Sequence, residues 1–199
     1  MRRSFTALVT AGIAALSLLT GTAAASATPH SATAAQMSCT VVIDQFATRG
    51  PAGQNDQYIQ LKNIGIGSLS LGDFRVMADT GASTPPFVLA TIPMGTILLP
   101  GRPYLIANAG YSGPLPDQFW SGITLPDRVG VGLVSPPGTT VDAAATIASS
   151  MFVRGAAASP QPPNTQPLAN MRLTNTGNNA VDFSILTRTP GVPGPVGSC

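Results

Sequence analysis

The sequence predicts an all-β protein, arranged as a two-sheet antiparallel β-sandwich. The chain of 199 residues contains 21 glycines, 19 prolines and no glutamate, a composition that disfavours helices and favours strands joined by turns. In residues 57–63 aliphatic side chains alternate with polar ones, which predicts a strand that buries one face and exposes the other. The alternating residues are Ile59, Gln60, Leu61 and Lys62.

The predicted strands of the first half are short, and turns that contain glycine or proline separate them. They span residues 40–46, 57–63, 69–71, 74–78, 87–92, 96–99 and 103–108. Phe74 and Val76 are two positions apart, so both are expected to face the interior. Turns at this spacing are typical of a sandwich of short antiparallel strands.

The second half begins with a long predicted loop, residues 109–122. Residues 129–134 alternate again, and a proline-glycine turn leads into residues 139–144, which predicts a β-hairpin. The stretch 147–169 is rich in alanine, serine and proline and is typical of a loop or an extended linker. Residues 180–185 predict a final strand before a rigid tail rich in proline and glycine.

The first residues indicate an exported protein. Arg2 and Arg3 precede an apolar run, and Ala25-Ser26-Ala27 supplies the small-x-small pattern of a signal peptidase site. Spanning a membrane takes about 20 strongly apolar residues, so we expect no transmembrane anchor. Residues 1–27 are therefore interpreted as a signal peptide, and we expect a secreted, extracellular protein, with association with the cell wall as an alternative.

The remaining chain is long enough for one domain with a core. We expect a flexible lead-in at residues 28–38 that holds His30, a sandwich core at 39–146 and a closing segment of the same domain at 147–199. Ten lysines and arginines, less the two arginines of the signal peptide, leave eight basic residues against eight aspartates. A net charge near zero disfavours nucleic acid as a partner, and we expect a monomer.

The two cysteines flank the predicted domain. Cys39 precedes the first strand and Cys199 ends the chain. Because paired cysteines are common in exported proteins and the ends of a domain often lie close together, we expect a disulfide between them. Two free or intermolecular thiols are the alternative.

Six ordered segments of the chain are similar to those of the lamin tail domain, the immunoglobulin-like module of nuclear lamins that also occurs in exported bacterial proteins. They are residues 55–63, 71–76, 92–96, 99–108, 122–127 and 131–142, and residues 178–183 with 189–191 resemble the stretch that closes the bacterial form. Gln57, Gln60 and Phe74 depart from the acidic residue and tryptophan that the family often carries. The resemblance implies an immunoglobulin-like sandwich and a binding or scaffolding module with no catalytic residues to transfer.

Few residues of the chain are suited to catalysis. His30 lies in the lead-in, which argues against a Ser-His-Asp or Cys-His arrangement and against a histidine zinc site. We expect no bound cofactor. Calcium, held by Asp44 with Asn55 and Asp56 or by Asp127 with Asp142, is a weaker alternative, because such residues more often cap turns. The scattered arginines are interpreted as surface charges: Arg49, Arg102, Arg128, Arg154, Arg172 and Arg188.

Three aromatic residues of the long loop are candidates for a surface contact: Tyr111, Phe119 and Trp120. They would bind a carbohydrate or a protein, although the Phe119-Trp120 pair more often folds back to close the end of a sandwich. We therefore expect a secreted, non-catalytic interaction module whose partner is a protein or a cell-envelope polymer. The alternatives are a carbohydrate-binding module and a hydrolase that uses Asp56, Asp127 or Asp142.

Overall fold

The computed structural model describes residues 37–81 and 85–198. These residues form strands and one short helix. The bounds are β1 (Val41–Ala47), β2 (Tyr58–Asn63), β3 (Leu69–Ser70), β4 (Arg75–Asp79), β5 (Phe87–Thr91), β6 (Ile97–Leu98), β7 (Pro103–Asn108), β8 (Gln118–Trp120), β9 (Gly130–Val134), β10 (Thr140–Ala145), β11 (Leu168–Arg172), α1 (Asn179–Asp182) and β12 (Phe183–Thr187). The predicted signal peptide and most of the lead-in, with His30, lie outside the described residues.

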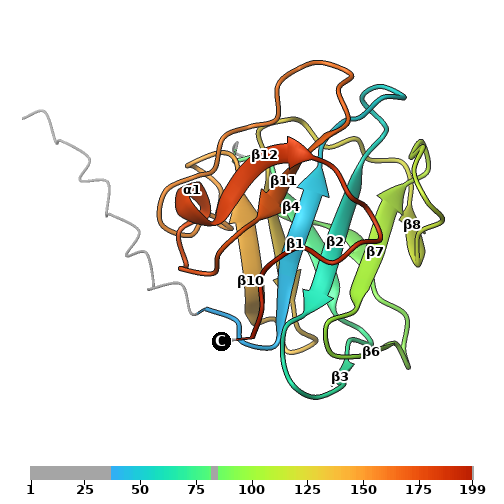
Figure 1. Ribbon diagram of the computed structural model, residues 1–199, viewed down its shortest axis with the longest axis vertical. Helices are drawn as coiled ribbons and strands as arrows, with labels where there is room; N and C mark the ends of the chain where they lie inside the picture. The colour runs from blue at the N-terminus through green and yellow to red at the C-terminus, as the bar shows by residue number, and fades with distance from the viewer. Residues whose placement is uncertain (1–36, 82–84, 199) are drawn as a thin grey trace, which may run out of the picture. The chain divides into compact units, whose positions relative to one another are not determined.

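Two main sheets form the fold. The six-stranded sheet has the order β12-β11-β1-β2-β7-β8, the four-stranded sheet has the order β10-β9-β4-β5, and β3 pairs with β6 in a small third sheet (Figure 1). All pairs are antiparallel except β7 with β8, which is parallel. The predicted all-β sandwich is therefore confirmed. None of the described helices is long and apolar enough to cross a membrane.

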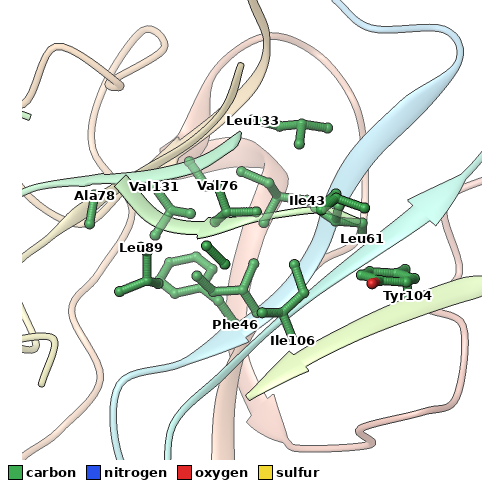
Figure 2. Close-up of a cluster of buried hydrophobic side chains, with 14 of the residues drawn as sticks. Ile43, Phe46, Leu61, Val76, Ala78, Leu89, Tyr104, Ile106, Val131 and Leu133 are labelled. Atoms are coloured by element: carbon green, nitrogen blue, oxygen red, sulfur yellow. The ribbon is translucent and has the colours of Figure 1, made fainter. Parts of the chain in front are cut away.

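The core lies between the two main sheets. Side chains from β1, β2 and β7 on one sheet meet side chains from β4, β5 and β9 on the other (Figure 2). Ile59 and Leu61 are buried as predicted, and so is Val76, while Phe74 is partly buried and packs against the same cluster. The period-2 pattern of the strands thus identified the core correctly.

The predicted strands of the first half and the β9–β10 hairpin are present with small shifts of their ends, but β11 was missed. It starts within the stretch interpreted as a linker and lies between β1 and β12. Asn170 is paired with Phe46, and Arg172 with Phe183. Residues 169–172 do alternate between apolar and polar, but the two polar residues are buried on the same side as the core residue Phe46. The core side of β11 therefore lacks the apolar residues by which the other strands were recognised.

Two further predictions need correction. The loop at 109–122 contains β8, and Gln118 of this strand donates a hydrogen bond to the carbonyl of Thr91 in β5, which joins the edges of the two main sheets. The final strand was predicted at 180–185, but α1 occupies its first part and β12 follows. The side chain of Asn178 caps the helix by accepting a hydrogen bond from the Ala180 amide.

The prediction that β2 exposes one face is wrong. Gln60 is 0% exposed and Lys62 is 8% exposed, because a C-terminal segment covers the outer face of the sheet. We call residues 188–198 the strap. Figure 1 shows this segment crossing β1 and β2 in dark red, and its backbone is bonded to side chains of both strands.

Candidate functional site

Asp56, one of the three candidate hydrolase residues, is bound by an arginine. Its carboxylate oxygens lie 2.9 and 3.1 Å from the guanidinium nitrogens of Arg188. The hydroxyl and amide of Ser112 and the amide of Ala52 donate to the same carboxylate. Burial alone would raise the pKa of Asp56, but the hydrogen bonds from Arg188, Ser112 and Ala52 outweigh it and lower the pKa to about 2. The carboxylate is therefore ionised at neutral pH and holds three loops together.

Asp142 is the centre of a buried ion cluster. It accepts hydrogen bonds from Arg154 at 2.9 Å, from Arg172 at 2.7 Å and from the Ile43 amide at 2.6 Å. Arg172 is also paired with Asp182 at 3.4 Å. Two carboxylates and two guanidinium groups leave the cluster neutral. Burial lowers the pKa of Arg154, while the charge of Asp142 opposes this shift.

Asp127 forms the third pair, with Arg49, at 2.8 and 2.5 Å, and this hydrogen bonding raises the pKa of Arg49. The interpretation of the arginines as isolated surface charges is therefore wrong for four of them: Arg49, Arg154, Arg172 and Arg188. Arg102 and Arg128 are exposed as expected. The partners lie between 10 and 132 residues apart along the chain, and no local sequence pattern marks these pairs.

The residues named for calcium have other partners. Asp44 accepts hydrogen bonds from the side chain of Gln60 and the amide of Gly194, both at 2.8 Å. Asn55 accepts a hydrogen bond from the Thr124 hydroxyl, and the other three carboxylates face guanidinium groups. Within residues 37–81 and 85–198, no three His, Cys, Asp or Glu side chains gather as a metal site would require. The expectation of no bound cofactor, with calcium as the weaker alternative, stays a prediction.

The three aromatic candidates do not share one surface. Trp120 is 4% exposed, belongs to the core and donates its indole N–H to the Ile123 carbonyl. Phe119 is 53% exposed and Tyr111 is partly buried against Tyr58, with ring centroids 5.7 Å apart. Burial raises the pKa of Tyr111 to about 12. Of the Phe119-Trp120 pair, Trp120 therefore folds back into the sandwich. The prediction that Trp120 forms part of a surface contact is wrong.

Sequence reasoning missed a group of exposed apolar side chains around the β3–β6 sheet. We call them the apolar end: Ile66, Met94, Ile97 and Leu99. Ile66 is 96% exposed and Met94 is 81% exposed. Ile66 was the sequence signal that could have revealed this group. Its two neighbours are turn glycines, which have no side chains to cover it.

The predicted disulfide cannot be placed, because Cys199 lies outside the described residues. The described part of the strap does approach the start of β1, since Val196 packs against Val42 and Ile64. The bond between Cys39 and Cys199 stays a prediction.

Comparison with known proteins supports the fold alone. No protein-family model matches the chain, and no curated protein is significantly similar to it. A similar solved structure is the crystal structure of a DUF4876 family protein from Bacteroides thetaiotaomicron VPI-5482. The two share 12% sequence identity and a TM-score of 0.52, over 80% of this chain and 72% of the other. Nothing in these comparisons bears on the lamin-tail resemblance, which stays a prediction.

Proposed function

We propose that this chain is an exported, non-catalytic interaction or scaffolding module of the lamin-tail type that acts at or outside the cell envelope. The observation that carries the proposal is the apolar end. Exposed apolar side chains on linked turns favour an interaction site, and full burial of one such side chain is worth roughly 1.5–3 kcal/mol. A partner that covers Ile66, Met94, Ile97 and Leu99 would gain this free energy.

Hydrogen bonds hold the apolar end together. The side-chain amide of Asn63 donates to the carbonyls of Gly67 and Leu98, both at 2.8 Å. This ties the turn that carries Ile66 to β6. Leu98 faces inward, so its neighbours Ile97 and Leu99 face outward. The exposed side chains are therefore presented by a fixed backbone, which lowers the entropic cost of binding.

The geometry of the aspartates weighs against the hydrolase alternative. A general acid needs a raised pKa, whereas the pKa of Asp56 is lowered to about 2. Asp127 and Asp142 are likewise bonded to arginines. The carbohydrate-binding alternative loses one of its aromatic residues through the burial of Trp120.

A retention assay with matched variants tests the proposal. The exported protein, purified from culture medium and immobilised, should retain a component of the cell-envelope fraction. The double substitution Ile66→Ser, Ile97→Ser should reduce retention at least tenfold, whereas Leu115→Ser, at an equally exposed site elsewhere, should not. Equal retention by all three proteins would reject the apolar end as the binding surface.

Two measurements on the same material test export and the lack of turnover. Mass spectrometry should find a mature start near Thr28, and finding only the full-length form in the cytosol would contradict export. The protein should not hydrolyse glycan, ester, peptide or nucleic-acid substrates. Turnover that disappears in a folded Asp56→Asn, Asp127→Asn or Asp142→Asn variant would replace this proposal with the hydrolase.

A further inference from the structure

The outer face of β1 and β2 carries four polar side chains that the strap covers, and we call this face the groove. Its side chains are Asp44, Gln45, Gln60 and Lys62, and all four are buried. Three of them alternate with core residues in the normal way. Asp44 is the extra residue of a β-bulge, since the register with β2 shifts between Ile43 and Gln45. The bulge places two polar side chains side by side on the outer face.

The side-chain amides of Gln60 and Gln45 bind the backbone of the strap through both their oxygen and their nitrogen atoms. Gln60 accepts from the Gly191 amide at 2.7 Å and donates to the Val192 carbonyl at 2.8 Å. Gln45 accepts from the Thr189 amide at 3.2 Å and donates to the Thr189 carbonyl at 3.0 Å. The strap backbone that they bind includes a turn, in which the Val192 amide donates to the Thr189 carbonyl and Gly191 has a φ of 81°. This recognition depends on the shape of the backbone and little on the side chains of the bound segment.

The two charged residues of the groove bind the next part of the strap. Lys62 donates to the carbonyls of Gly194 and Val196, each at 2.6 Å. Asp44 accepts from the Gly194 amide at 2.8 Å. These charge-assisted bonds are stronger than those between neutral groups.

The groove selects for sequence at two positions. A Cβ on Gly194 would lie 2.5 Å from one Asp44 carboxylate oxygen and 3.2 Å from the carboxyl carbon, so a larger residue there would displace the carboxylate that binds the strap. That oxygen, Oδ1, is buried and has no hydrogen-bond partner within the described part of the chain. Two positions later, Val196 fills an apolar site formed by Val42 and Ile64.

We propose that this groove is a peptide-binding site and that its ligand in trans is the strap of a second copy of the chain. The segment that fits the groove is rich in proline and glycine, turns at Gly191, and has glycine over Asp44 and valine two residues further on. Once the predicted Cys39–Cys199 bond is open, exchange between two copies keeps every hydrogen bond described above, so it costs little beyond association itself. The inference goes beyond the proposed function and does not depend on it.

A synthetic peptide of residues 188–198 tests the groove. In the full-length Gly194→Ala chain the added Cβ meets the Asp44 carboxylate and should weaken the seating of its own strap. The peptide should therefore bind this chain and raise its melting temperature by several degrees. A peptide with Gly194→Ala should not bind this chain. A peptide with Gly197→Ala should bind it, because a Cβ on Gly197 meets nothing within 4 Å. The wild-type chain should bind the peptide at least tenfold more weakly, since its own strap competes at a high effective concentration.

A mixing experiment tests whether the ligand comes from a second copy. The Gly194→Ala chain has an intact groove and a defective strap, and a Gln60→Ala chain has the reverse. Under reducing conditions, so that the predicted Cys39–Cys199 bond cannot tether the strap, their mixture should form a one-to-one dimer by analytical ultracentrifugation. Neither chain alone should dimerise. A mixture of the Gln60→Ala chain with a Gly197→Ala chain, in place of the Gly194→Ala chain, should not form the dimer.

Two outcomes would overturn the proposal. One is a folded Gly194→Ala chain that binds no peptide, and the other is peptide binding without dimers in the mixture, which would assign the groove to a foreign ligand. If Gly194→Ala fails to fold, Val196→Asp takes its place, because a charge against Val42 and Ile64 should expel only the strap. A Val196→Asp chain that is folded and binds no wild-type peptide would also reject the groove.

Discussion

At the scale of single residues, polar groups hold this protein together from within. Arg172 is fully buried, is paired with Asp142 and Asp182, and has its guanidinium carbon 4.5 Å from the centre of the Phe183 ring. Removing one member of a buried ion cluster leaves the other charge without a partner, which costs more than the pair contributes. The paired arginines and aspartates are therefore part of the fold.

The first prediction concerns two neighbours on β2. Leu61→Ala should lower the free energy of unfolding by roughly 2–5 kcal/mol, because it leaves a cavity in the core. Lys62→Ala should lower it by roughly 1–3 kcal/mol, because two strap carbonyls lose their donor. Sequence alone predicted that Lys62 faces solvent. Urea unfolding measures both effects, with exposed Arg102→Ala as the control, and a silent Lys62→Ala would mean that the strap does not bind in solution.

The second prediction is a pH dependence from Asp56. Its pKa is lowered from 3.8 to about 2 in the folded protein, so the unfolded chain binds a proton first as the pH falls. The stability contribution is complete above about pH 4 and is lost as the pH falls toward 2. The melting temperature should drop across this window. Asp56→Asn should be less stable at pH 7 and should show a smaller drop, and an equal drop in both proteins would contradict the assignment.

At the scale of elements, the segment 147–153, part of the stretch predicted to be a loop or an extended linker, is a loop that covers the outer face of the four-stranded sheet. Asp79 of β4 accepts hydrogen bonds from the hydroxyl of Ser150 and the amide of Met151. Phe152 packs with Val134 and Ala143. Gly130 and Gly132 of β9 leave the space that Ser150 and Phe152 occupy. The glycines of β9 are therefore required by packing.

The third prediction follows from Gly132. A Cβ at this position would overlap the ring of Phe152, so Gly132→Ala should destabilise the protein by roughly 1–3 kcal/mol. Gly67→Ala, where a Cβ meets nothing within 4 Å, is the control. In a Phe152→Ala background the effect of Gly132→Ala should shrink, and a double-mutant cycle by urea unfolding measures the difference. An unchanged effect would show that Phe152 is not the obstacle.

At the scale of the described domain, segments from the second half of the chain cover the outer faces of both main sheets. The strap lies on β1 and β2, and residues 147–153 lie on β4 and β9. Both sheets are therefore buried on two sides over part of their area. The strap also joins the end of the chain to its first strand.

The fourth prediction is the disulfide between Cys39 and Cys199. Peptide mapping without reduction should recover both cysteines in one linked pair. By the chain-entropy model, closing a loop of this length stabilises the protein by roughly 5 kcal/mol at most, so Cys39→Ser should lower the melting temperature. Alkylation of both thiols in the folded, unreduced protein would contradict the bond.

The sequence by itself determined the fold class, most strands and the core. Alternation along a strand is a local property with a period of two residues, so Ile59 and Leu61 could be assigned to the interior from their neighbours alone. Turn residues are local signals too, and they marked the β9–β10 hairpin. The strand β11 was lost because its core-side residues, Asn170 and Arg172, are polar.

Only the tertiary structure decided which polar residues are buried. Lys62 has its hydrogen-bond partners 132 and 134 residues away along the chain, and Asp142 binds arginines of two separate segments. Such contacts depend on which segments the fold brings together, and no local pattern records them. The single-residue shift at Asp44 also has no local signature, yet it places the carboxylate under Gly194. For this reason the sequence predicted the sandwich, whereas the ion pairs, the apolar end and the groove became visible only in the folded chain.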